Sequence, residues 1–228
     1  MKLKKLTDRV WITPFEDARD RPSLGYLRGD RYSLAVDAGH SKAHVEEFYA
    51  ALEAEGLPLP ALTVLTHWHW DHSFGLHAVR GVTAAGERTQ AHLKEVLDRW
   101  QERGGGQYFK HLDPHIALEY GEEPIHVCLA DLTLREELAL DPGGLPVRCF
   151  PLPSPHTDDC TFLLAPQEGV LFVGDAVCGP YPSYEDNLEK RQELIAALAA
   201  LDFRLAVGGH WEVYTKRSLM EDLEDGIV

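Results

Sequence analysis

The sequence predicts an α/β fold in one domain that spans residues 1–228. Two observations carry this prediction. Apolar, β-branched segments alternate along the chain with segments of helical periodicity, which is typical of layered sheets and helices. No segment has the composition of a linker between domains, and the hydrophobic content of 44% is ordinary for a globular chain of this length.

The first half of the chain begins with three expected strands, at 9–15, 24–30 and 32–39, and Gly29 to Arg31 form the turn between the last two. A helix is expected over 41–56, with Ser41 as the N-cap and Gly56 as the stop signal. The continuously apolar run at 61–67 predicts a strand covered on both faces. A second helix is expected over 87–103.

The second half has a less regular start. Residues 104–127 are rich in Gly, Pro, His and Tyr, and we interpret them as an excursion over the surface that controls access to the site. Four further strands follow, a helix is expected over about 185–201, and a last strand is expected over 203–209.

One order of elements occurs twice along the chain, and we call this repeat the internal echo. The segment 32–69 and the segment 169–211 both run as strand, Asp, helix, strand and His, with Asp37 and His67 in the first and Asp175 and His210 in the second.

Charge and cysteine usage limit the partners and the compartment. The net charge is −15, which argues against nucleic acid as a partner, because nucleic acid binding needs Lys and Arg. No apolar run has the length of a signal peptide core or a membrane span. The four cysteines show no close spacing, so we expect reduced thiols and a cytoplasmic protein. A small-molecule substrate remains, and the sequence does not predict the oligomeric state.

The segment "LTVLTHWHWDHSFG", residues 62–75, places three histidines and an aspartate within six positions. Buried imidazoles and carboxylates need partners, and a metal cation supplies several at once. His67 and His69 are two apart, so in an extended segment both point the same way, whereas Trp68 and Trp70 are expected to point away from them.

Three more candidate ligands stand where apolar strands end, and the ends of strands in an open α/β sheet meet in one crevice. Seven candidates result: His67, His69, Asp71, His72, His156, Asp175 and His210. A single tetrahedral zinc site with an open position needs three protein ligands. Seven suit two adjacent ions that share a bridging carboxylate and water, with a single ion as the alternative.

The motifs "THWHWDH", "SPHTDD", "FVGDAV" and "GGHW" occur in the order found in the metallo-β-lactamase superfamily, and the chain resembles that family from about residue 9 to residue 214. The resemblance implies an αββα sandwich of two facing mixed β-sheets with helices on the outer faces. It also implies that His67, His69 and His156 hold one ion, that Asp71, His72 and His210 hold the other, and that Asp175 bridges them.

Several departures leave the subfamily open. The best-known β-lactamases place Cys where this chain has Asp175, and related lactonases place Tyr where it has Cys178. The 18 residues after His210 leave no room for the extension with which hydroxyacylglutathione hydrolases bind glutathione, and the inserted domain of the large nucleases is missing.

The expected function is hydrolysis of a small ester, thioester, lactone or phosphodiester by a hydroxide that bridges two divalent ions. Zinc is the expected metal, with iron or manganese as alternatives. Asp71 is also expected to act in catalysis by orienting the proton of the nucleophile, while Asp37 and Thr157 are expected to fix ligand imidazoles. Two other functions stay open: an iron-dependent redox enzyme of the same fold, and a non-catalytic metal-binding protein.

Overall fold

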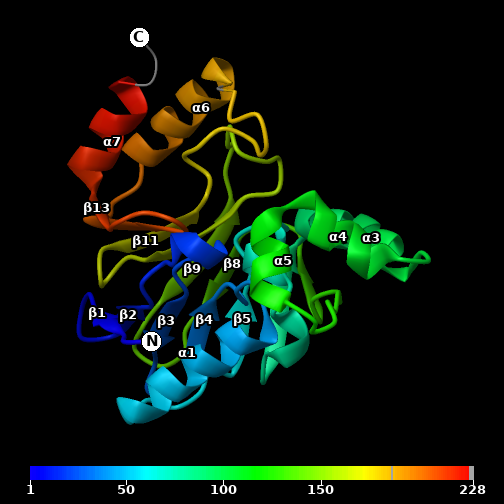
Figure 1. Ribbon diagram of the computed structural model, residues 1–228. Helices are drawn as coiled ribbons and strands as arrows, with labels where there is room; N and C mark the ends of the chain where they lie inside the picture. The colour runs from blue at the N-terminus through cyan, green and yellow to red at the C-terminus, as the bar shows by residue number, and fades with distance from the viewer. Residues whose placement is uncertain (186, 226–228) are drawn as a thin grey trace.

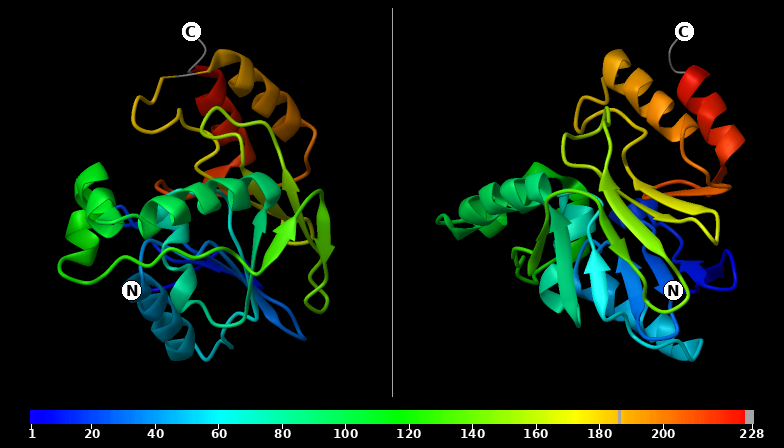
Figure 2. Two further views of the ribbon diagram at one scale, coloured as in Figure 1. Left: turned by 90° about the vertical axis from the view of Figure 1, so that its right-hand side faces the viewer. Right: turned by 180° about the vertical axis from the view of Figure 1, so that it is seen from behind.

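Two β-sheets face each other in the computed structural model, which describes residues 1–185 and 187–225 (Figure 1). Helices cover the outer face of each sheet, so the order of layers is helix, sheet, sheet, helix (Figure 2). This arrangement confirms the predicted αββα sandwich, in which each sheet buries one face against its partner and the other against helices.

The first sheet has seven strands in sequence order. They are β1 (Lys4–Lys5), β2 (Val10–Ile12), β3 (Gly25–Arg28), β4 (Ser33–Val36), β5 (Leu62–Val64), β6 (Val82–Gly86) and β7 (Leu132–Leu134). The pairs from β1 to β4 are antiparallel, and the pairs from β4 to β7 are parallel. The expected turn at Gly29 to Arg31 therefore joins an antiparallel pair, β3 and β4.

The second sheet has the order β13-β12-β11-β10-β9-β8. Its strands are β8 (Leu138–Leu140), β9 (Val147–Pro151), β10 (Thr161–Ala165), β11 (Val170–Gly174), β12 (Leu205–Gly208) and β13 (Tyr214–Thr215). Only β11 and β12 pair in parallel among these strands, and the other neighbours are antiparallel.

The core between the sheets consists of aliphatic side chains from both inner faces. Leu34 and Val36 of the first sheet share one buried cluster with Leu163 and Phe172 of the second. The sheets approach closely there, because a Cβ atom on Gly25 would lie 2.4 Å from the Phe172 ring. A larger residue at position 25 would have to push the sheets apart.

Helix α1 (Lys42–Ala54) covers the outer face of the first sheet, where Val45, Phe48 and Leu52 pack against it. The Ser41 hydroxyl accepts a hydrogen bond from the His44 backbone N–H, so Ser41 is the N-cap, as predicted. Helices α6 (Leu188–Ala199) and α7 (Lys216–Asp225) cover the second sheet. The expected helix over 87–103 is α3 (Glu87–Gln101).

The prediction that residues 104–127 have no regular secondary structure is wrong. Two short helices fold there, α4 (Gly105–Leu112) and α5 (Pro114–Tyr120). Phe109, Ile116 and Tyr120 are buried in a cluster with Trp70 and Phe74. The last two belong to the segment 62–75, which carries four of the candidate ligands. Gly104 to Gly106 and Pro114 are compatible with these helices because they stand at helix starts, where an N-terminal Pro is favoured, and Gly121 is the C-cap of α5.

The internal echo of the sequence corresponds to two equivalent units. Strands β4 and β5 form a parallel pair joined by α1, and strands β11 and β12 form a parallel pair joined through α6. Each unit ends its strands at the same edge of the sandwich, because parallel strands share a direction. Within the described residues, no helix has both the length and the apolar character that a bilayer crossing requires.

Candidate metal centre

All seven predicted ligands meet at this edge of the sandwich. His67 and His69 follow β5, and Asp71 and His72 lie in the short helix α2 (Trp70–Ser73). His156 lies in the connection from β9 to β10, while the two remaining candidates follow β11 and β12. Six of the seven residues are buried, and the side chain of His210 is 20% exposed.

Three imidazoles form the first group. The Nε2 atom of His67 lies 3.1 Å from Nδ1 of His69, and Nε2 of His156 lies 3.0 Å from that same Nδ1. Ligating nitrogens of the three residues all lie within 4.8 Å of one another. Neutral imidazole nitrogens held this close need a proton or a cation between them, since facing lone pairs repel.

Two carboxylates and two imidazoles form the second group. His210 Nε2 lies 2.9 Å from Asp71 Oδ2, and His72 Nε2 lies 3.1 Å from the same oxygen. Asp175 reaches both imidazoles, with 3.5 Å from Oδ1 to His72 Nε2 and 3.6 Å from Oδ2 to His210 Nε2. An Asp175 oxygen also lies within 4.8 Å of a His156 nitrogen, so this carboxylate stands between the two groups.

Two buried atoms of the second group fit a cation in particular. His72 Nε2 faces oxygens of Asp71 and Asp175 at 3.1 and 3.5 Å, but neither His72 Nε2 nor Asp175 Oδ1 meets hydrogen-bond geometry with a described residue. A buried polar atom that makes no hydrogen bond is costly, and a bound cation removes that cost. Gly209 leaves the necessary space, because a Cβ atom there would lie 2.3 Å from Asp175 Oδ1. Nitrogen and carboxylate donors in this mixture suit zinc and also iron or manganese.

The protonation states differ between the groups. Burial, followed by the neighbouring imidazoles, lowers the pKa of His67 well below its ordinary value and that of His69 to about 3. Burial also opposes the charged form of His72 and His210, but the carboxylates outweigh it. Asp71, Asp175 and Asp37 raise the pKa of His72 well above its ordinary value, and Asp175 and Asp71 raise the pKa of His210 to about 9. His67 and His69 are therefore ready to bind a cation at neutral pH, while His72 and His210 must release protons.

Asp37 contacts the second group through the Nδ1 atom of His72, on the opposite side of the ring from Nε2. Its backbone has a φ of 66°, in the left-handed region that Asp tolerates better than most residues. Its Oδ2 atom lies 2.8 Å from His72 Nδ1, and its Oδ1 atom accepts a hydrogen bond of 2.6 Å from the Thr66 backbone N–H. The carboxylate at the end of β4 thus orients an imidazole of α2.

Thr157 was expected to play the same part for a ligand imidazole, and the structure contradicts this. Its hydroxyl donates to an oxygen of Asp159 and lies 3.4 Å from Cys160 Sγ. His156 is held instead by the Gly179 carbonyl oxygen, 2.9 Å from its Nδ1, and by the Ser154 hydroxyl, which accepts from its backbone N–H. The chain turns sharply after His156 and so carries Thr157 away from the imidazole.

A cavity of about 290 Å³ opens onto both groups. Besides candidate ligands and Cys178, it is lined by aromatic and acidic side chains: Asp17, Asp20, Trp70, Tyr181, Tyr184 and Trp211. No signal in the sequence pointed to Asp17 and Asp20, whereas Tyr181 and Tyr184 stand just after the position where related lactonases have a Tyr. Trp70 follows His69 at the start of α2, where the chain stops being extended, so the expected alternation does not apply to it. Burial and the Asp71 carboxylate raise the pKa of Asp20 to about 6.

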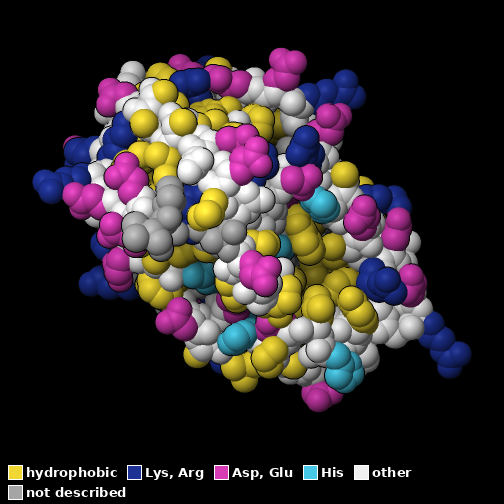
Figure 3. Space-filling model, turned by 90° about the horizontal axis from the view of Figure 1, so that it is seen from above, with side chains coloured by type: hydrophobic (Ala, Val, Ile, Leu, Met, Phe, Trp, Pro, Cys, Tyr) yellow, Lys and Arg dark blue, Asp and Glu magenta, His cyan; other side chains and the backbone are white. Residues whose placement is uncertain are grey.

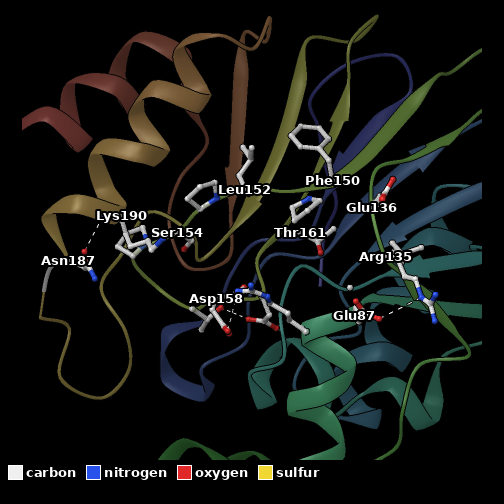
Figure 4. A pocket seen from close by; sticks show the side chains of 18 residues that line it. Glu87, Arg135, Glu136, Phe150, Leu152, Ser154, Asp158, Thr161, Asn187 and Lys190 are labelled. Carbon is white, nitrogen blue, oxygen red and sulfur yellow. Dashed lines mark hydrogen bonds and ion pairs between the residues drawn. The ribbon is translucent and has the colours of Figure 1, made fainter.

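A larger cavity of about 670 Å³ is lined by Ser154 and Asp158, which flank His156 in the sequence (Figure 4). Phe150 and Leu152 provide apolar walls, while Glu87, Arg135 and Asp158 contribute charges. None of its described lining residues belongs to the seven candidate ligands. The smaller cavity is therefore the one in which chemistry at the candidate metal groups would occur.

Comparisons with known proteins agree with this architecture. The chain is 26% identical over 180 residues to an atrochrysone carboxyl ACP thioesterase from Aspergillus fumigatus, and this match covers 79% of the chain but 47% of the relative. The chain therefore spans about half the length of that curated relative.

Solved structures match over nearly the whole chain. A metallo-beta-lactamase from Pontibacter korlensis superposes with a TM-score of 0.68 at 18% identity, over 98% of this chain and 97% of that one. The sec-alkyl sulfatase PisA1, as a double mutant, gives 0.70 at 13% identity, over 98% of this chain and 41% of that one. At these identities the likeness shows a shared fold. The sequence pattern of the metallo-beta-lactamase superfamily matches residues 19–222, and the chain belongs to that superfamily.

Proposed function

We propose that the chain is a metal-dependent hydrolase with a dinuclear site. His67, His69 and His156 hold one ion, Asp71, His72 and His210 hold the other, and Asp175 bridges them. The observation that supports this most directly is the position of Asp175, whose carboxylate lies 3.5 and 3.6 Å from nitrogens of the second group and within 4.8 Å of a His156 nitrogen of the first. Zinc is the proposed metal, and iron or manganese would suit the same donors.

Two ions in these groups would supply a hydroxide nucleophile at neutral pH, because a shared water loses a proton more readily beside two dications. Asp71 lies between His72 and His210, at 3.1 and 2.9 Å, so its carboxylate can accept a hydrogen bond from that nucleophile and fix its direction. Asp37 keeps the Nε2 atom of His72 directed into the site, and the Gly179 carbonyl oxygen does the same for His156.

The proposed substrate is a small ester, thioester, lactone or phosphodiester. The similarity to a protein named as a thioesterase supports acyl transfer to water. The net charge of −15 argues against nucleic acid, and the described side chains on the face in Figure 3 form no continuous Lys and Arg patch. Four free cysteines support a cytoplasmic protein.

Metal content and hydrolysis, measured on the same preparation, test this function. Protein purified without added metal and then reconstituted with zinc should hold two ions per chain. It should also hydrolyse members of a panel of small esters, thioesters, lactones and phosphodiesters. One ion or fewer after reconstitution would contradict the dinuclear site. Two ions without hydrolysis would favour a non-catalytic metal-binding protein, and iron that cycles between redox states would favour the redox alternative.

A further inference from the structure

Beyond its candidate ligands and Cys178, the metal cavity is lined by two kinds of side chain. The aromatic ones are Trp70, Tyr181, Tyr184 and Trp211, and the acidic ones are Asp17 and Asp20. Among the described residues that line this cavity there is no Lys or Arg. In contrast, the larger cavity is lined by Arg88, Arg135 and Lys190.

Three of the aromatic side chains, Trp70, Tyr181 and Tyr184, pack edge to face. Trp70 and Tyr181 meet edge to face, with ring centroids 5.0 Å apart and planes at 84°. Tyr181 and Tyr184 do the same at 6.1 Å and 88°. The Tyr181 hydroxyl donates a 2.9 Å hydrogen bond to Asp113, which fixes its ring. The edge-to-face contacts hold these three rings in fixed orientations where they line the cavity, and an aromatic ring carries negative charge density on its faces.

The two carboxylates come from the helical turn η1 (Asp17–Arg19) and the residue that ends it. Oδ1 of Asp20 lies 3.7 Å from His210 Nδ1, and the Asp20 carbonyl oxygen lies 3.1 Å from Nδ1 of His40, which secures the turn against the centre. Neither Asp17 nor Asp20 forms an ion pair with a Lys or Arg of the described chain. Arg19, between them, pairs with glutamates instead.

The carboxylates of Asp17 and Asp20 differ from those of the candidate ligands in how their charge would be balanced. Asp71 and Asp175 would be neutralised by ions held in the proposed site. Asp17 and Asp20 lie outside both ligand groups, so their negative charge would stay in the filled site. An anionic substrate group would face this charge without a basic partner, while a cationic group would meet two carboxylates and the faces of aromatic rings.

We infer that the substrate carries a cationic, ammonium-type group that binds among Trp70, Tyr181, Tyr184, Asp17 and Asp20. The inference rests on the proposed hydrolase function and narrows its substrate class. A volume of about 290 Å³ suits a small quaternary ammonium beside a single ester bond, and aromatic faces are the usual surface for such cations.

A matched pair of esters tests the inference. Acetylcholine and 3,3-dimethylbutyl acetate have nearly the same shape and differ in the charge of one atom. The zinc-loaded protein should hydrolyse the cationic ester with a kcat/KM at least about tenfold higher. Asp20→Asn and Tyr184→Leu should each move that ratio toward one. Tyr184 is 60% exposed, so its replacement leaves the core intact.

Asp8→Asn is the control, because it changes the net charge by the same amount at a residue that lines a different surface cavity. It should leave the ratio unchanged. Equal kcat/KM values for both esters would overturn the inference while leaving the hydrolase function standing. An equal fall of the ratio in Asp8→Asn would also overturn it, because the preference would then reflect only net charge.

Calorimetric binding of choline to the zinc-loaded protein separates the two levels of the proposal. If neither ester is hydrolysed, the hydrolase function has failed for these esters, and binding decides the inference alone. Choline that binds the unmodified protein more tightly than 3,3-dimethylbutanol does, and more weakly to Asp20→Asn, supports the cation site. Equal binding of choline and the neutral alcohol contradicts it.

Discussion

Asp37 Oδ2 lies 2.8 Å from His72 Nδ1, with both side chains buried. This contact joins the end of β4 to helix α2, which is 35 positions later in the chain. Because Nδ1 faces the carboxylate, it carries the proton in the neutral ring, and Nε2 keeps its lone pair toward the centre. Asp37 is not a candidate ligand itself, but its contact sets the orientation of His72, which is one.

Replacing Asp37 by Asn should weaken metal binding about 10- to 100-fold, because an amide holds the imidazole less strongly than a carboxylate. A zinc titration with a competing chelator measures the change. Asp131→Asn is a matched control: Asp131 also accepts hydrogen bonds from the backbone N–H and hydroxyl of a strand threonine, Thr83, but outside the centre. Equal metal affinities for both variants would show that Asp37 acts only in the fold.

Asp175→Asn should lose or weaken one ion and reduce turnover steeply. The variant keeps the shape of the side chain but removes the negative charge between two dications, and an amide binds cations far more weakly than a carboxylate. Elemental analysis and kcat on a cleaved ester measure both effects, and circular dichroism should show an unchanged fold. Two tightly bound ions with near-normal turnover would mean that Asp175 is not the bridge.

Acidification should empty the second group before the first. The pKa of His210 is raised to about 9 and that of His72 is also raised, so a cation there competes with protons once the pH falls below about 9. The pKa of His69 is lowered to about 3 and that of His67 is also lowered, so a cation on these two imidazoles meets little competition from protons near neutral pH. Each proton displaced costs about tenfold in affinity per pH unit.

Elemental analysis after dialysis between pH 5 and pH 9 at constant free zinc should therefore show two steps. The ion of the second group is lost as the pH falls from 9, and the ion of the first group is retained to lower pH. Parallel loss of both ions over one pH interval would contradict the difference between the groups.

Removal of one partner of the Arg21–Glu119 ion pair should destabilise the fold by up to about 3–5 kcal/mol, because it takes away the nearest partner of a buried charge. Arg21 Nη2 lies 2.8 Å from Glu119 Oε1, and the side chains are 3% and 0% exposed. Glu47 stays within 3.0 Å of Arg21 and Arg19 within 3.9 Å of Glu119, so part of the charge remains compensated. The pair fastens α5 to the segment that carries Asp20. Urea unfolding of Arg21→Met and Glu119→Gln measures the loss.

The double variant Arg21→Met/Glu119→Leu provides the comparison. It removes both charges, so it should be more stable than the less stable single variant. Single variants as stable as the unmodified protein would show that water or other groups compensate these charges.

The sequence by itself determined the layers and the seven candidate ligands. Strands and helices follow from the local periodicity of apolar residues, and His67, Asp175 and His210 were found because each stands just past an apolar strand. Parallel strands end at one edge, so residues at those ends meet whatever the connections between them do. Asp37, which follows β4, was expected near the ligands because "AVDAG" resembles a strand-end motif of the family.

Only the tertiary structure decided what surrounds those ligands. Helices α4 and α5 are too short and too rich in Gly and Pro for a sequence signal, and they form because Phe109 and Ile116 are buried against Trp70 and Phe74. Thr157 failed as a positioning residue because one turn of the chain directs its hydroxyl to Asp159. Asp20 and Tyr184 reach the cavity from loops far apart in sequence, and no local pattern carries the information that two such loops converge.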